Sequence, residues 1–289
     1  MLGVSTLSDT NEDTSAVKTP NLADVIAQRF LSRRDAKAIQ YSNGSYAPHR
    51  LNGKDIPWSR ANLEAHLAGT ETFGHYLINT DIHNTVKLFA FDIDLQKTGV
   101  YPDKWDTDPL SDTPDIHSPI QFNPREAWLV RSHPARSFLK LQMKLIAHEL
   151  LDSIITNLNI PCAAAYSGNK GIHVYGFTGA LSAETARDGA GIILDSLNHY
   201  SPTKGSNFFV DNNDDLFRGF KNFTIEVFPK QDSVSVESYG NLMRLPLGVN
   251  QHNSKDPTFF IDMTCPLGVL KPVDPFHALA GQPFRMVGE

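Results

Sequence analysis

The sequence predicts an α+β protein in which helices alternate with strands that pair mostly as hairpins. Apolar residues recur at helical spacing in residues 137–158, for example at Ile146, Leu150 and Ile154. Short apolar runs such as residues 87–94 are instead typical of buried strands, and turn-forming Gly, Asn and Pro separate them. Helices mixed with hairpin-like strands in this way favour an α+β fold with a mixed or antiparallel sheet.

Capping residues and turns predict where the elements begin and end. Thr19 and Pro20 suit the N-cap and first turn of a helix, Ser59 and Gly69 suit the start and end of the next, and Ser182 suits the start of another. The expected helices span residues 22–31, 60–68, 137–158 and 183–200. The expected strands lie within residues 36–58 and at residues 74–79, 87–94, 162–166, 172–177, 223–229, 233–238 and 241–248.

Two segments differ in character from the rest of the chain. Residues 1–18 are polar and acidic with few bulky apolar groups, so we expect a disordered leader. Residues 96–126 are rich in Pro and Asp and have neither helical nor strand periodicity, which predicts a long loop insertion. Such loops are either functional or mobile, so this one could be a flap near the strand that precedes it or an inert surface insertion.

The composition is ordinary for a soluble globular protein and excludes several function classes. The chain has 289 residues, of which 40% are apolar and 20% charged, so it can bury a sizeable core. A net charge of -6 means that any nucleic-acid contact must come from a local basic patch. The two cysteines, Cys162 and Cys265, cannot build a disulfide framework or a four-cysteine zinc site. With no long apolar run and no signal peptide at the start, we expect a cytoplasmic protein without membrane association.

The strand predicted at residues 87–94 carries two acids in an apolar run. Asp92 and Asp94 are separated only by Ile93, so they point to the same side of the strand, roughly 6.5–7 Å apart along the chain. Two carboxylates on one face of a buried strand repel each other and lose hydration, and a divalent metal ion is the natural counter-charge. The alternative is that Asp94 caps a turn at the strand end while Asp92 pairs with an arginine.

The segment SGNKGIH, residues 167–173, joins two predicted strands. Its two glycines, Gly168 and Gly171, let the backbone approach a ligand closely, and successive backbone N–H groups can bind an anion. Lys170 adds a charge suited to phosphate, Ser167 adds a hydroxyl, and His173 opens the next strand. The alternative is an ordinary glycine hairpin with an exposed lysine and a core histidine.

Two further charged residues interrupt predicted strands. Glu226 lies in an apolar strand and Lys230 follows it closely, which also suits a cross-strand salt bridge. Arg244 lies in a strand-like run before Pro246 and suits bidentate phosphate contacts, although a buried arginine paired with an acid is the other explanation. Together, three acids, a phosphate-binding loop, a histidine and an arginine are what two-metal nucleotidyl transfer requires.

The order of these motifs resembles the archaeo-eukaryotic primase superfamily, which includes the primase-polymerases of phages and plasmids and the polymerase domain of bacterial DNA ligase D. SGNKGIHVY is similar to the motif of the ligase-associated polymerases. HLAGTETFGHYLIN, FAFDID, FPKQD and GNLMRLPLG are similar to primases of mobile elements and conflict systems. The resemblance extends from about residue 28 to residue 255.

This resemblance implies an N-terminal α/β unit and an RRM-like sheet, with the active site in the cleft between them. It implies that Asp92 and Asp94 form the first metal-binding motif and that Glu226 is the third acid, together holding two Mg²⁺ or Mn²⁺ ions. The residues that would surround the incoming nucleotide are Ser167, Gly168, Lys170, Gly171, His173 and Arg244.

The sequence therefore predicts a primase-polymerase that transfers nucleotides from NTPs or dNTPs to a primer or an initiating nucleotide on a single-stranded DNA template. Residues 19–289 would be its single catalytic domain, the N-terminal part of a longer replication protein that works with a helicase, in the cytoplasm of a bacterial host if phage or plasmid encoded. Lys204, Arg218 and Lys221, interleaved with phenylalanines, are candidate contacts to template phosphates. The alternatives are a catalytically inactive nucleic-acid-binding replication module and another two-metal enzyme such as a nuclease.

Overall fold

The computed structural model describes residues 21–102, 119–197, 200–203, 206–209, 222–252, 256–266 and 268–280. Its helices are α1 (Leu22–Phe30), α2 (Arg60–Leu67), the 3-10 helix η1 (Thr80–Ile82), α3 (Pro124–Leu129), α4 (Ala135–Leu158), α5 (Ala183–Asp195) and α6 (Pro275–Leu279). Its strands are β1 (Ala38–Gln40), β2 (Tyr46–Pro48), β3 (Arg50–Leu51), β4 (Lys54–Asp55), β5 (Phe73–Tyr76), β6 (Thr85–Leu95), β7 (Gly99–Pro102), β8 (Pro119–Phe122), β9 (Cys162–Tyr166), β10 (Gly171–Ser182), β11 (Tyr200–Thr203), β12 (Ser206–Phe209), β13 (Phe223–Phe228), β14 (Leu242–Arg244) and β15 (Phe259–Phe260).

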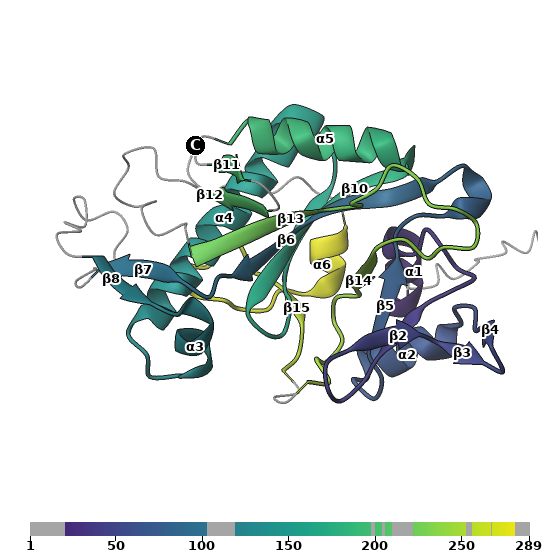
Figure 1. Cartoon of the computed structure of the whole chain (residues 1–289), viewed down its shortest axis with the longest axis horizontal. Helices are drawn as coiled ribbons and strands as arrows, with labels where there is room; N and C mark the ends of the chain where they lie inside the picture. Colours follow the sequence, from purple (N-terminus) through teal and green to yellow (C-terminus); the bar gives the residue numbers. More distant parts are fainter. Residues whose placement is uncertain are drawn as a thin grey trace, which may run out of the picture.

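Two sheets organise the chain (Figure 1). The larger sheet has seven strands in the order β11-β12-β13-β6-β10-β9-β15, and the smaller has four in the order β14-β5-β1-β2. The pairs β3–β4 and β7–β8 form two separate ladders. Every pairing between these named strands is antiparallel. The α+β class expected from the sequence is confirmed.

The central strand of the larger sheet, β6, is flanked by β13 and β10 and is largely buried. Phe89, Phe91 and Ile93 are fully buried on one face of β6. Helices α4 and α5 pack along one side of this sheet (Figure 1). Helix α1 lies on the other side, where the Phe30 ring contacts the rings of Tyr175 and Phe177 with centroids 5.1 and 5.3 Å apart.

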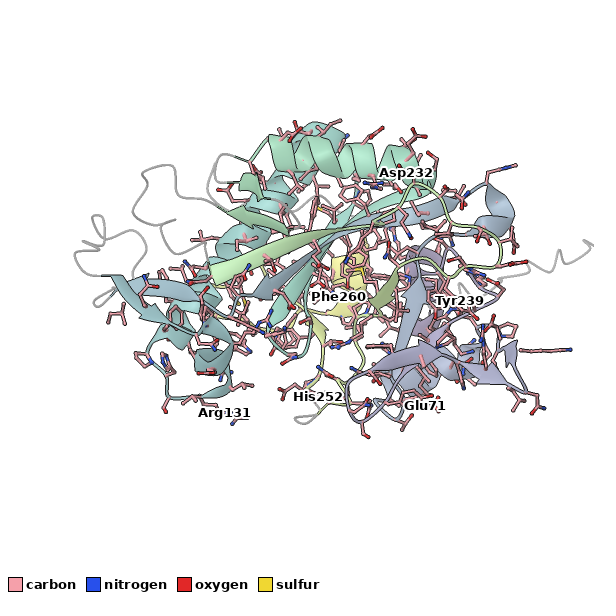
Figure 2. The ribbon with its side chains drawn as sticks, viewed as in Figure 1. Glu71, Arg131, Asp232, Tyr239, His252 and Phe260 are labelled. Carbon is pink, nitrogen blue, oxygen red and sulfur yellow. The ribbon has the colours of Figure 1, made fainter. Side chains whose placement is uncertain are left out.

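The smaller sheet has its own apolar cluster. Ala36, Ala38 and Tyr76 form its buried centre, and Tyr239, which Figure 2 labels, stacks on Tyr76 with ring centroids 4.7 Å apart. Strand β14 joins this sheet at β5, with Arg244 opposite Gly74. Strand β14 comes from late in the sequence, and its pairing with β5 brings Arg244 to the junction of the two sheets.

The predicted helices are present, with some changes at their ends. Asn21, not Thr19, is the N-cap of α1, because its side chain accepts a hydrogen bond from the Ala23 amide. Ser59 and Asn62 form a capping box at α2, and Gly69 follows this helix with φ +73°. Ser182 caps α5 as expected, and α5 ends at Asp195 rather than at residue 200.

Two predicted segments differ from the structure. Residues 233–238 alternate like a strand but form none, and the Val234 amide instead donates to the side chain of Asn84. The Pro/Asp-rich stretch 96–126 is not all loop, because its two ends pair as β7 and β8 and α3 begins at Pro124. Alternation of apolar and polar residues is weak evidence for a strand when no neighbouring strand pairs with the segment. A ladder as short as that of β7 and β8 has too few residues to show a periodicity in the sequence. The middle of that stretch, residues 103–118, and the predicted leader lie outside the described residues.

None of the helices in the described ranges has the length and apolar character needed to cross a membrane.

Candidate active site

The candidate catalytic residues lie in two rows across three neighbouring strands. His173 on β10, Asp92 on β6 and Glu226 on β13 are direct register partners. The next row, two residues along β6, contains Gly171, Asp94 and Thr224. Side chains opposite each other in an antiparallel sheet, and those two residues apart, share a face. The fold therefore brings together the three acids that the sequence separates.

Asp92 is paired with the histidine in its row. His173 Nε2 lies 3.3 Å from Asp92 Oδ1, and the Tyr175 hydroxyl lies 3.0 Å from His173 Nδ1. The Asp92 carboxylate accepts a hydrogen bond from His173 Nε2, and the Tyr175 hydroxyl contacts the other ring nitrogen, so the imidazole is held between the two side chains. Burial would raise the pKa of Asp92, but the charge of His173 and its hydrogen bond, with Arg244 and Lys230 farther away, leave this pKa below its usual value. Asp92 is therefore held as a carboxylate.

Asp94 is paired with the lysine of the glycine loop. Lys170 Nζ lies 3.1 Å from Asp94 Oδ2, and the two side chains are 28% and 35% exposed. The pKa of Asp94 is raised, first by burial and then by the negative charge of Asp92, with Lys170 opposing both effects. The repulsion expected from the sequence between Asp92 and Asp94 thus contributes to the raised pKa of Asp94, second to burial.

Gly171 allows this close approach of the loop to Asp94. A Cβ atom at Gly171 would lie 2.3 Å from the Ile93 carbonyl oxygen and 2.5 Å from Asp94 Oδ1. Only glycine fits in this position.

Glu226 forms an ion pair of its own. Lys230 Nζ lies 2.8 Å from Glu226 Oε2, and the two side chains are 41% and 48% exposed. The sequence offered a cross-strand salt bridge as the alternative to a metal-binding role, but the observed pair is local, because Lys230 lies four residues after Glu226 and just beyond the end of β13. The register nevertheless places Glu226 directly opposite Asp92. Glu226 thus lies on the face that a third metal ligand would require while it pairs with Lys230.

Arg244 connects the smaller sheet to the glycine loop. Its Nη1 donates to the Ser167 carbonyl oxygen at 2.6 Å, and its Nε donates to the Tyr46 hydroxyl at 2.7 Å. The sequence did not identify Tyr46, because a tyrosine on a short strand, β2, has no local signal that would place it beside Arg244. Arg244 thus lies next to Ser167 and holds the start of the loop.

The rest of the loop is fixed by contacts on several sides. The Ser167 amide donates to the Gly171 carbonyl oxygen at 3.0 Å, and Gly168 has φ +78°. The Asn169 carbonyl oxygen accepts hydrogen bonds from the Tyr166 hydroxyl at 2.7 Å and from Trp128 Nε1 at 2.5 Å. The loop is therefore a rigid element, which suits a preformed anion-binding site.

The residue types on this face suit hard divalent cations, since Mg²⁺ and Mn²⁺ prefer carboxylate oxygens. Within the part of the chain that the structure describes, no group of three or more His, Cys, Asp or Glu side chains is arranged to hold an ion. Each acid of the candidate site instead contacts a basic side chain: His173 for Asp92, Lys170 for Asp94 and Lys230 for Glu226. Joint metal binding would require side-chain rotations that exchange these partners.

The three candidate template contacts, Lys204, Arg218 and Lys221, lie outside the described residues.

Comparison with known families agrees with this arrangement of fold and site. Residues 24–268 match the family model of the archaeo-eukaryotic primase domain of the TOTE conflict system. The chain therefore belongs to the archaeo-eukaryotic primase superfamily, in its conflict-system branch, and to a primase-like family of nucleotidyltransferases. A search of curated proteins found no match to this chain.

Proposed function

We propose that this chain is a metal-dependent primase-polymerase that makes and extends strands on a single-stranded DNA template. The observation that carries the proposal is the shared face of Asp92, Asp94 and Glu226, which lies beside the rigid loop at residues 167–171. Acids on one face next to a basic, amide-rich loop suit a nucleoside triphosphate with its metal ions.

In this proposal the chain's own residues bind and orient the NTP or dNTP. The 3′ hydroxyl releases its proton to solvent and attacks the α-phosphorus, a new P–O bond forms, and pyrophosphate leaves as the bond between the α-phosphorus and the oxygen that bridges it to the β-phosphorus breaks. Lys170 and His173 contact the phosphates, and Arg244 fixes the loop through Ser167 and offers its remaining guanidinium edge. Two divalent cations, Mg²⁺ or Mn²⁺, held by Asp92, Asp94 and Glu226 would activate the hydroxyl and neutralise charge on the leaving group.

Two alternatives make different predictions. A binding module without catalysis has no use for two repelling acids on one strand face, which argues against that role. A two-metal nuclease would use the acids but has no need for a loop that holds a triphosphate, so nucleotide binding separates it from a polymerase. The proposed partners are single-stranded DNA, NTPs or dNTPs, and a helicase domain or protein.

The direct test is primer-free synthesis on single-stranded DNA, with NTPs and dNTPs supplied separately and with Mg²⁺ or Mn²⁺. We expect the wild-type chain to make product and Asp92→Ala to make none while it stays folded. Asp188→Asn, which removes an exposed carboxylate from α5, is the matched control and should keep full activity. Synthesis by Asp92→Ala at the wild-type rate would overturn the proposal.

The nucleotide-binding residues have a separate test. Loss of one charge-assisted hydrogen bond costs roughly 1.5–3 kcal/mol, or about ten- to a hundredfold in affinity. We therefore expect His173→Ala and Arg244→Ala to raise KM for the nucleotide, with His173→Ala also lowering kcat, and Lys170→Ala to act more mildly. Template affinity, measured at fixed salt and metal, should change little. Equal losses for nucleotide and template would mean that these residues support the fold only.

A further inference from the structure

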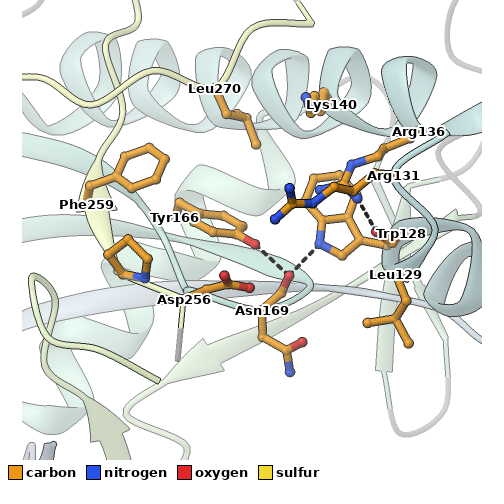
Figure 3. Close-up of a pocket in the computed structure, with 11 residues that line it drawn as sticks. Trp128, Leu129, Arg131, Arg136, Lys140, Tyr166, Asn169, Asp256, Phe259 and Leu270 are labelled. Atoms are coloured by element: carbon orange, nitrogen blue, oxygen red, sulfur yellow. Dashed lines mark hydrogen bonds between the residues drawn. The ribbon is translucent and has the colours of Figure 1, made fainter. Parts of the chain in front are cut away.

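A cavity lies against the glycine loop on the side away from the acids. It has a volume of about 500 Å³ and opens beside the start of α4 (Figure 3). Aromatic rings and basic side chains dominate its lining, namely Trp128, Tyr166, Phe259, Arg131, Arg136 and Lys140. Aromatic rings stack on nucleobases and cations bind phosphates, so this composition suits a nucleic-acid ligand.

The basic side of the cavity carries excess positive charge. Arg136 lies over the Trp128 ring, 4.8 Å from its centroid, and donates to the Trp128 carbonyl oxygen at 2.7 Å. Lys140 is half-buried, and burial together with the charge of Arg136 lowers its pKa. No ion pair within the described ranges involves Arg131 or Lys140, and Asp256 is the one acid among the described residues that line the cavity.

The charged surface is longer than this cavity. A second hollow of about 400 Å³ adjoins it and shares Arg131, Arg136 and Lys140. The second hollow also includes His133, whose ring stacks on Phe122 with centroids 6.1 Å apart. Two adjoining hollows that share three cations suit successive phosphates of a strand better than one isolated mononucleotide.

The aromatic side of the cavity is joined to the glycine loop. Tyr166 pairs in register with Ile172, the neighbour of His173, so Tyr166 projects from the face opposite His173. Phe259 is the register partner of Tyr166 on β15, and the two rings are 5.3 Å apart between centroids. Asn169, at the tip of the loop, lines the cavity and is bonded through its carbonyl oxygen to Tyr166 and Trp128. The cavity and the acids therefore lie on the two sides of one rigid loop.

We propose that this cavity binds one nucleotide unit of the single-stranded template outside the catalytic face, with its base against Tyr166 and Phe259 and its flanking phosphates on Arg131, Arg136 and Lys140. That the bound strand is a template rests on the proposed function, whereas the binding of a single strand in this cavity does not. The described residues that line this cavity are other than Lys204, Arg218 and Lys221, the template contacts expected from the sequence.

The test is the affinity for a short fluorescein-labelled oligothymidylate, measured by fluorescence anisotropy over a salt series with EDTA and without nucleotide. Arg131→Ala/Lys140→Ala removes two phosphate contacts, each of which contributes about tenfold or more to affinity, so we expect Kd to rise roughly a hundredfold at low salt. The slope of log K against log salt should become shallower by about 1.4, which is about 0.7 for each contact. Phe259→Leu keeps an apolar side chain but removes the ring, and it should weaken binding about fivefold with an unchanged slope.

Arg34→Ala/Lys54→Ala is the control, because it removes two exposed cations from the N-terminal part of the chain. It should leave Kd within about twofold of wild type. Equal losses in both double variants would show a general electrostatic effect and overturn the proposal. A loss of ATP binding without a loss of oligothymidylate binding in Arg131→Ala/Lys140→Ala would also overturn it, by assigning the cavity to a mononucleotide. Circular dichroism of each variant checks that it is folded.

The same measurements separate this proposal from the proposed function. If the wild-type chain makes no product but binds oligothymidylate through Arg131 and Lys140, the cavity is a single-strand binding site and the proposed polymerase activity is wrong. If synthesis proceeds and the Arg131→Ala/Lys140→Ala variant binds the strand like wild type, the polymerase stands and the cavity proposal fails.

Discussion

Replacement of Asp94 by asparagine tests whether this carboxylate binds a metal ion or only pairs with Lys170. The change keeps the size of the side chain and removes its charge. In the absence of metal it relieves the repulsion from Asp92, which contributes to the raised pKa of Asp94. It also breaks the ion pair with Lys170, whose Nζ lies 3.1 Å from Asp94 Oδ2.

The two effects can be weighed against each other. Two unit charges roughly 6.5–7 Å apart repel by about 2 kcal/mol at an effective dielectric constant of about 20. The ion pair with Lys170 is partly exposed, and such pairs contribute about 1 kcal/mol or less after solvent screening. We therefore expect Asp94→Asn to unfold at a Tm about 2 °C higher than the wild type when no metal is present.

Divalent metal should reverse this order of Tm values, so that the wild type unfolds at the higher temperature. A ligand at about 100 times its Kd stabilises the folded state by about 2.7 kcal/mol, which for a chain of this size raises Tm by roughly 5 °C. Differential scanning fluorimetry with Mn²⁺, Mg²⁺ or EDTA measures both effects, and Asp188→Asn serves as the matched loss of an exposed carboxylate. We expect wild type and Asp188→Asn to show the metal-dependent rise and Asp94→Asn to lose most of it. If the Tm of Asp94→Asn rises with metal as much as that of the wild type, Asp94 is not a metal ligand. If Asp94→Asn has a clearly lower Tm than the wild type in EDTA, the ion pair with Lys170 outweighs the repulsion from Asp92.

Changes at three further positions give separate checks. Gly171→Ala should lower the free energy of unfolding by at least about 2 kcal/mol in urea titrations, because the new Cβ would lie 2.3 Å from the Ile93 carbonyl oxygen; an unchanged midpoint would contradict this. Burial lowers the pKa of His66 to about 4. We expect the free energy of unfolding of the wild type to fall by about 3 kcal/mol as the pH falls from 6.5 toward 4, because the unfolded chain takes up the proton first. His66→Gln should flatten that part of the stability profile, and an identical profile would exclude His66. Glu226→Ala should lose most synthesis and Glu226→Asp should retain some, whereas two fully active variants would leave Glu226 only as the ion-pair partner of Lys230.

The sequence predicted the parts of the site that depend on local pattern. Asp92 and Asp94 share a face because alternation along a strand follows from backbone geometry alone. The glycine loop was predicted because Gly168 and Gly171 let the backbone approach another group closely, and the structure shows such an approach at Gly171, which lies against Asp94. Both signals need only a few consecutive residues.

The remaining features depend on which strands become neighbours, and no short pattern carries that information. Glu226 lies opposite Asp92 only because β13 pairs with β6, and Arg244 reaches Ser167 only because β14 joins the smaller sheet. Tyr46 and the aromatic cavity near Trp128 were missed for the same reason, since their residues come from several elements far apart in the sequence. The strand expected at residues 233–238 is absent, because alternating residues without a neighbouring strand cannot form a ladder.

The pairing of each candidate metal ligand with a basic side chain has a consequence for how ligands would bind. Carboxylates on one strand face repel each other, and His173 and Lys170 offset that repulsion by contacting Asp92 and Asp94. The same two basic residues are the ones that the proposed function assigns to the triphosphate. If the carboxylates were to hold divalent ions, His173 and Lys170 would lose their partners and would become available to phosphate oxygens. Because coupling between two sites is reciprocal, we expect metal and nucleotide to raise each other's affinity beyond the contribution of metal already bound to the free nucleotide. A chain whose acids and cations form ion pairs with one another is thus suited to bind its two charged ligands together rather than either one alone.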